Sequence, residues 1–207
     1  MIQYLQEVNA KVGTRETFTM PLVLIQQVVF PGIVSSVTLR TKGASSSVRV
    51  ASIQDHSLLF ALERHDHEPC TVATTGRLID VAEHHDSWQL QVAGIQRAHV
   101  LSYRHQGNGL IGQFRYVSEA EESIPPLLME EAWALASELS AMVSPQRGHI
   151  GLPQTPALLS YWIAAHVPLN ATTQQELLEI PTSRGRLAKE ISLMRTLLDG
   201  LRTEHSS

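Results

Sequence analysis

The sequence lacks the features that mark secreted and membrane proteins. It has one cysteine, Cys70, which excludes an internal disulfide framework and indicates a reducing compartment. No stretch approaches the roughly 20 apolar residues that a membrane-spanning helix needs. The first residues lack the basic start and the apolar run of a secretory signal. We therefore expect a cytoplasmic protein that does not cross a membrane.

Positive charge is also scarce. Lysine occurs only at Lys11, Lys42 and Lys189, the arginines are scattered, and the formal net charge is -4. Proteins that bind nucleic acids usually carry clustered Lys and Arg. Nucleic acid is therefore not a favoured partner.

The motifs of several common enzyme classes are missing. There is no G-x-x-x-x-G-K-[ST] loop for nucleotide phosphates, no Gly-x-Ser-x-Gly elbow and no Ser-x-x-Lys pair. We assign no catalytic residue and no cofactor.

The strongest pattern that is present is a pair of strands in the middle of the chain. From Trp88 to Val92 apolar and polar residues alternate, the period of a strand with one face on a core. Residues 71–81 are rich in β-branched and aliphatic types, and the polar residues 84–87 predict a short loop between two antiparallel strands. Gly94 predicts a bulge or a close backbone approach.

Other segments extend this pattern into a barrel. Pro21 is expected at a sheet edge or at the start of a strand, because it cannot donate to a ladder. Short connections between about six strands favour a closed or nearly closed, mostly antiparallel β-barrel. The remaining predicted elements are two strands around Pro31 and Gly32 in residues 18–40, a helix at Lys42–Gln54 with Val48, Ala51 and Ser52 inward, and strands at Ser57–Leu62 and Leu110–Val117.

After Ser118 the apolar period changes from two to 3.6, which marks a domain boundary. We predict an α+β protein with an N-terminal extension at residues 1–17, a β-barrel at 18–118 and a helical subdomain at 119–207. Four helices are expected: one after Pro126 with Leu128, Leu135, Leu139 and Met142 on one face, one from Thr155 and Pro156 to Pro168, one with a capping box at Thr172 and Gln175 or at Thr173 and Glu176, and one along Leu187, Ile191, Met194, Leu198 and Leu201.

Four strings in this order resemble the N-terminal domain of the Lon protease family, the LON domain that also occurs in cereblon. The first is MPLVLIQQVVFPG, and the second is VATTGRLIDV followed by WQLQVAGIQRAHV, with Gly94 and Arg97 on a Gly-x-x-Arg pattern. The others are LLSYWIAAHVPLN and QQELLEIPTSRGRL, which ends in the pair Arg186 and Leu187.

The resemblance implies a PUA-like β-barrel with a helical extension, a module that engages substrates in Lon and helps to organise its assembly. The ATPase and Ser-Lys peptidase modules of Lon have no counterpart in these residues, and one cysteine cannot supply the four-cysteine zinc site of cereblon. We therefore expect a non-catalytic protein that binds polypeptides, as a substrate-recognition module or as an accessory to a protease. The binding surface and the oligomeric state are left open.

Two alternatives stay open beside this reading. PUA-like barrels also serve RNA-modifying proteins, which makes RNA a second candidate partner. The loop HDHEPC offers His65, His67 and Cys70 as metal ligands, although such histidines are more often polar loop residues. His84, His85 and Asp86 are weaker additions, and we expect no bound metal. A structural role is expected for Arg97, and core positions for Trp88, Trp133 and Trp162.

Overall fold

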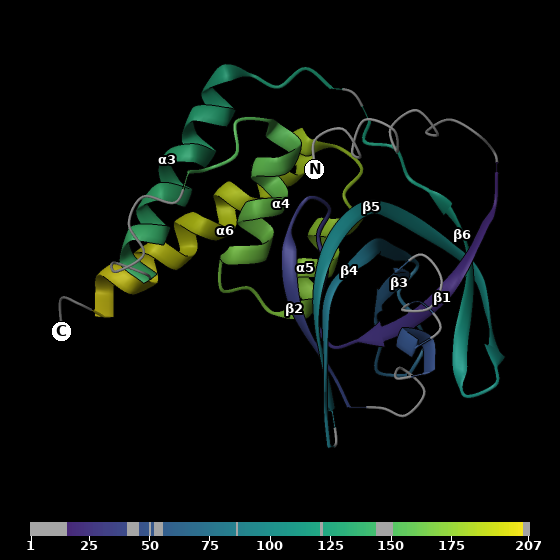
Figure 1. The fold of residues 1–207 in the computed structure, drawn as a ribbon. Helices are drawn as coiled ribbons and strands as arrows, with labels where there is room; N and C mark the ends of the chain where they lie inside the picture. The colour runs from purple at the N-terminus through teal and green to yellow at the C-terminus, as the bar shows by residue number, and fades with distance from the viewer. Residues whose placement is uncertain are drawn as a thin grey trace. The chain divides into compact units, whose positions relative to one another are not determined.

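The computed structural model describes residues 16–40, 46–49, 51, 56–85, 87–120, 122–143 and 151–204 (Figure 1). The chain divides into two compact units, residues 1–118 and 119–207. In the described part of the first unit six strands follow one another: β1 (Phe18–Ile25), β2 (Val34–Leu39), β3 (Ser57–Leu62), β4 (Val72–His84), β5 (Ser87–Gln106) and β6 (Gly109–Tyr116). The second unit holds α3 (Pro126–Val143), α4 (Pro156–His166), α5 (Ala171–Glu179) and α6 (Ser183–Glu204).

The long strand β5 closes the sheet into a barrel. Its first half pairs with β2, its second half pairs with β6, and β4 pairs along most of its length (Figure 1). The order is β2-β5-β4-β3-β1-β6, and β6 returns to β5. Only β1 and β3 pair in parallel among the described strands. The expected α+β fold, a mostly antiparallel barrel followed by helices, is confirmed.

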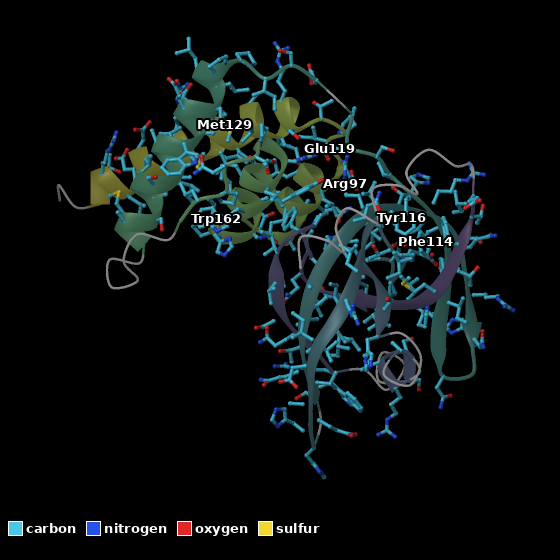
Figure 2. All side chains as sticks on the ribbon, turned by 45° about the horizontal axis from the view of Figure 1, so that its top comes forward. Arg97, Phe114, Tyr116, Glu119, Met129 and Trp162 are labelled. Carbon is cyan, nitrogen blue, oxygen red and sulfur yellow. The ribbon has the colours of Figure 1, made fainter. Side chains whose placement is uncertain are left out.

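The period of two seen in the sequence places one face of each strand in the barrel core. Leu90 and Val92 of β5 are fully buried, while Gln89 and Gln91 between them are exposed. At the other end of the barrel, the rings of Phe114 and Tyr116 meet edge to face with centroids 5.3 Å apart (Figure 2). Phe18 packs against both rings.

Gly94 is required by a close backbone approach, as the sequence predicted. A Cβ at this position would lie 2.1 Å from the carbonyl oxygen of Phe30. The amide of Gly32 donates to the Gly94 oxygen at 2.9 Å, and the Gly94 amide donates to Ile33 at the same distance. The register between β4 and β5 also shifts next to Gly94, so a bulge accompanies the approach.

Some local predictions for the first unit were wrong. Pro21 is not on an edge strand, because β1 lies between β3 and β6; its ladder with β3 begins one residue later, at Leu22. The antiparallel pairing of β4 and β5 across a short loop is confirmed, but His84 and Ser87 form the last pair of the ladder instead of lying in the loop.

The helix predicted for Lys42–Gln54 is described only in part. It is helical at residues 46–49 and 51, where Val48 and Ala51 are fully buried as expected. Ser52 and most of the predicted extension at 1–17 lie outside the described residues.

In the helical unit, α6 packs against α3 and α4. The predicted stripe of α6 is confirmed at Leu187, Ile191, Met194 and Leu198, which are buried, while Leu201 near the end of the helix is half-buried. No helix in the described part of the chain is long and apolar enough to span a bilayer.

Two predictions for the surface of α3 were wrong. Of the predicted face Leu139 is buried as expected, but Met142 is 39% exposed, and the other buried residues of the helix are Ala132 and Ala136. Trp133 is 36% exposed instead of core, and its indole donates to the carbonyl of Pro153. Small residues therefore carry the closest packing of this helix.

The predicted N-cap was confirmed for α4 and was wrong for α5. Thr155 is the N-cap of α4, with Pro156 at the first helical position, but its side chain makes no capping hydrogen bond. The capping box predicted for α5 was wrong. Its N-cap is Asn170, whose side-chain oxygen accepts from the amide of Thr173 at 2.8 Å.

Candidate functional site

The polar segment after β3 forms a closed, well-ordered turn. Glu63 and Pro69 pair as an antiparallel bridge, and the main-chain amide of Arg64 donates to the main-chain carbonyl oxygen of Glu68 at 2.8 Å. His67 adopts a φ of 63°, a left-handed conformation that is uncommon outside glycine. Its amide donates to the Arg64 oxygen, which helps to hold that conformation. These backbone contacts define the course of the loop that carries the charged side chains.

This loop, the strand β1 and the hairpin of β5 and β6 enclose a cavity of about 380 Å³, here called the acidic cleft. Leu22, Leu24 and Leu110 form its apolar wall. The remaining lining side chains are polar: Glu63, Asp66, Glu68, His67, Tyr103, His105 and Asn108.

A second cavity of about 580 Å³ shares Glu68, Tyr103 and His105 with the acidic cleft. It is lined by Arg64 and Arg104, and we call it the arginine-flanked cleft. Because the two cavities share residues, they form neighbouring compartments of one recessed surface on the barrel.

A hydrogen bond stands at the boundary between the two clefts. The hydroxyl of Tyr103 donates to the carboxylate of Glu68. The hydrogen bond to Glu68 raises the pKa of Tyr103 above its ordinary value of 10.0, and the loss of hydration and the negative charge of Glu68 act in the same direction. Tyr103 therefore remains a neutral hydrogen-bond donor.

The other carboxylates of the acidic cleft are also oriented by neighbours. One carboxylate oxygen of Glu63 lies 2.8 Å from Nδ1 of His67, and the other accepts from the side-chain amide of Gln26 at 2.6 Å. Asp66 pairs with Arg64 at 2.6 Å. These contacts hold the acceptor groups in place beside the leucine wall.

The residues that the sequence singled out as metal ligands have different surroundings in the structure. His65 is an exposed turn residue, and the ring of His67 is hydrogen-bonded to the Glu63 carboxylate. Cys70 is half-buried, and its main-chain amide donates to the carbonyl oxygen of Leu62. Across the described ranges, no group of three or more His, Cys, Asp or Glu side chains is arranged to hold a metal ion.

The weaker metal candidates belong to the hairpin of β4 and β5. His84 ends β4 and His85 is in the turn, while Asp86 lies outside the described residues. That the 65–70 loop binds no metal stays a prediction.

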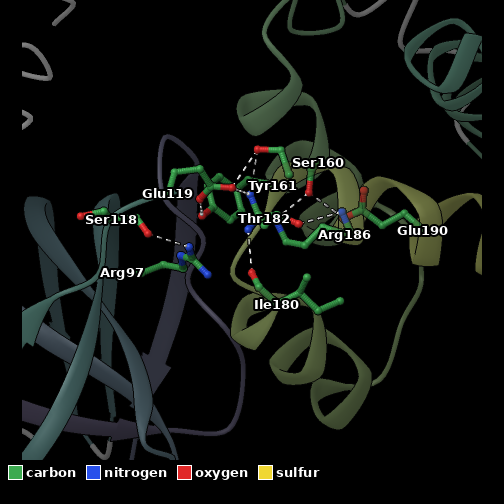
Figure 3. Close-up of polar contacts among 11 residues, drawn as sticks. Arg97, Ser118, Glu119, Ser160, Tyr161, Ile180, Thr182, Arg186 and Glu190 are labelled. Carbon is green, nitrogen blue, oxygen red and sulfur yellow. Dashed lines mark hydrogen bonds and ion pairs between the residues drawn. The ribbon is translucent and has the colours of Figure 1, made fainter. Parts of the chain in front are cut away.

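Arg97 is a buried residue of the barrel. Only 2% of it is exposed, and its guanidinium donates to the carbonyl of Ser118 at 3.4 Å (Figure 3). Its own carbonyl accepts from the amide of Val117. These contacts agree with the structural role expected for this arginine.

In the helical unit the family-like residue Arg186 is the centre of a buried polar network (Figure 3). It is fully buried, and its guanidinium donates to Ser160 Oγ and to the Ile180 carbonyl, both at 2.9 Å. It also forms an ion pair with Glu119 and lies over the ring of Tyr161, 4.3 Å from the ring centroid.

Glu190 is the member of this network that sequence reasoning missed. It is fully buried, and one oxygen accepts from the Ser160 hydroxyl at 3.1 Å. The other oxygen has no hydrogen-bond partner in the part of the chain that the structure describes. Burial raises the pKa of Glu190 to about 8, although the Ser160 hydrogen bond and the Arg186 charge act in the opposite direction.

A signal for Glu190 was available in the sequence. It lies three residues after Leu187 and four before Met194, on the apolar stripe of α6. An acidic residue at such a position must be buried with partners or in its neutral form. The network stabilises the helical unit and lines neither cleft of the barrel.

Comparison with known proteins covers most of the chain. The chain resembles two solved structures, the Lon N-terminal domain protein from Xanthomonas campestris and the N-terminal domain of Lon protease from the Mycobacterium avium complex. The first is 19% identical over 84% of this chain and 98% of that one, with a TM-score of 0.66. The second is 16% identical over 86% and 98%, with a TM-score of 0.68.

These identities establish likeness of fold. The comparison with curated proteins found no match. The model of the ATP-dependent protease La (LON) substrate-binding domain matches residues 19–196, which is most of the chain. The protein therefore belongs to the LON substrate-binding domain family.

Proposed function

We propose that this protein is a non-catalytic substrate-recognition module that binds polypeptides, and that the recessed surface of its barrel is the binding site. The observation that carries the proposal is the match of a substrate-binding domain over residues 19–196. The module acts either on substrates directly or as an accessory to a protease.

The recessed surface has the mixed character that a polypeptide requires. Ligand sites usually combine apolar walls with a few oriented polar groups. Here Leu22, Leu24 and Leu110 supply the wall, and Tyr103 and Asn108 supply hydrogen-bonding groups. Side chains on one face of an extended chain are about 7 Å apart, so two neighbouring clefts suit two such side chains.

Addition of a strand to an open edge is the other binding mode that we considered. Among the described strands β2 is the end of the sheet and pairs only with β5. However, the side chain of Gln27 already donates to the Ser36 carbonyl on β2 at 2.9 Å. The clefts are therefore the stronger candidate.

The proposal is tested by fluorescence anisotropy with a labelled, permanently unfolded polypeptide and the full chain. Asn108 is an exposed turn residue that lines the acidic cleft, so replacing it by Trp should obstruct the cleft and is expected to weaken binding at least ten-fold, about 1.4 kcal/mol. Gln89→Trp is the matched control, because Gln89 is exposed on the outer face of β5 and lines neither cleft. Equal binding by both variants and the original chain would remove the cleft from the proposal.

A further inference from the structure

The acidic cleft combines an apolar wall with uncompensated negative charge. Its lining includes Glu63, Asp66 and Glu68 but neither lysine nor arginine. Of the three carboxylates only Asp66 has an arginine partner, Arg64, among the residues that the structure describes. A guest that enters this cavity therefore meets an excess of negative charge.

The partners of the two other carboxylates leave that charge in place. The Glu68 carboxylate accepts from the neutral hydroxyl of Tyr103. Glu63 is bonded to the amide of Gln26 and to the ring of His67, which is 86% exposed. In the described part of the barrel neither carboxylate forms an ion pair with Lys or Arg.

We infer that the acidic cleft selects a lysine or arginine side chain of the bound polypeptide, an inference that rests on the proposed function. Lysine and arginine bury their aliphatic stems along apolar surface while their charged heads stay among polar groups. The wall of Leu22, Leu24 and Leu110 would receive the stem. The carboxylates of Glu63 and Glu68 would receive the head.

The neighbouring cleft shows that this preference is local. Arg64 and Arg104 line the arginine-flanked cleft, where Glu68 is the acidic residue. A negatively charged side chain suits that compartment, whereas the acidic cleft repels it. The two compartments thus discriminate by charge at adjacent positions.

The test uses the full chain and three labelled peptides that differ only at one central residue: lysine, norleucine or glutamate. Norleucine keeps the aliphatic stem of lysine and removes its charge. We expect the lysine peptide to bind about five-fold tighter than the norleucine peptide, and the preference to fall in high salt.

Variants locate the effect. In Glu63→Gln combined with Glu68→Gln, the lysine and norleucine peptides should bind equally. Glu83→Gln is the control, since Glu83 is an exposed carboxylate of β4 that lines neither cleft. It should keep the five-fold preference. The peptide series on the unchanged chain decides the matter even if the double variant does not fold.

The outcomes separate the inference from the proposed function. If the three peptides bind equally and Asn108→Trp still weakens them, the polypeptide site stands and the basic preference is wrong. If a glutamate peptide binds best, the preference is also wrong. If neither the peptides nor an unfolded polypeptide bind, both proposals fail.

Discussion

Replacing Glu190 by Gln tests whether the buried polar network of the helical unit contains a protonated carboxyl group. In the folded chain the pKa of Glu190 is about 8, against an ordinary value of 4.5. Between these two pH values the folded state keeps a proton that the unfolded state releases. The contribution of Glu190 to the free energy of unfolding therefore falls as pH rises through this window and is constant above it.

The size of the effect follows from the same two values. At about 1.4 kcal/mol per pH unit, the window from 4.5 to about 8 amounts to about 5 kcal/mol. Glutamine keeps an oxygen for the Ser160 hydroxyl and has no proton to lose. The side-chain amide of the glutamine places an unpaired N–H donor where the protonated carboxyl of Glu190 has an unpaired O–H donor. The costs of burying these two unpaired donors therefore largely cancel.

The assay is urea unfolding of the full chain at pH values from 5 to 9, followed by tryptophan fluorescence. Trp162 is 8% exposed in α4 and reports on the helical unit. We expect the variant and the original chain to have similar free energies of unfolding at pH 5. At pH 8 the variant should be more stable, by up to about 5 kcal/mol.

A control fixes the interpretation. Glu138 of α3 is half-exposed and pairs with Arg202 at 2.6 Å, so Glu138→Gln should change stability by at most about 1 kcal/mol. If the original chain and Glu190→Gln lose stability in parallel from pH 5 to 9, Glu190 is not protonated in the folded state and the reasoning is refuted.

Three further predictions follow from individual contacts. Gly94→Ala should destabilise the chain by about 3 kcal/mol in urea unfolding, since its Cβ would meet a backbone oxygen at 2.1 Å, whereas Gly200→Ala, with open space around it, should stabilise α6 by up to about 1 kcal/mol. Equal effects would contradict this account. Arg186→Met should cost about 3 to 5 kcal/mol because it leaves the half-buried Glu119 carboxylate without its cation and removes the guanidinium donors to Ser160 and Ile180, and a loss below 1 kcal/mol would count against the network. Elemental analysis should find no stoichiometric metal in the purified protein and no change in His67→Ala, because Nδ1 of His67 is held by Glu63; one zinc per chain would overturn this.

The architecture could be predicted because it depends on local periodicity. Alternation from Trp88 to Val92 specified the strand, and the change of period after Ser118 separated strands from helices. Short-range competition caused the errors. Asn170 is also a good N-cap residue, and it lies upstream of Thr172 and Thr173, so α5 begins at Ala171 with Asn170 as its N-cap.

The candidate site could be predicted only in part. The 65–70 loop was recognised as unusual, but its side chains were read as possible metal ligands. The acidic cleft joins this loop to Leu22 and Tyr103, which lie far away in the sequence. Their meeting depends on the register of β5 against β6, which shifts between Val100 and Ser102. Periodicity within one segment contains no information about such a register.

The central claim is that the acidic cleft of the barrel binds polypeptide, and amide NMR of the isotope-labelled full chain tests it most directly. On addition of the lysine peptide, we expect the largest shift changes at Leu24, Glu68, Tyr103 and Asn108. Gln89, on the outer face of β5, should not move. Saturable shift changes confined to residues outside the two clefts would contradict the account.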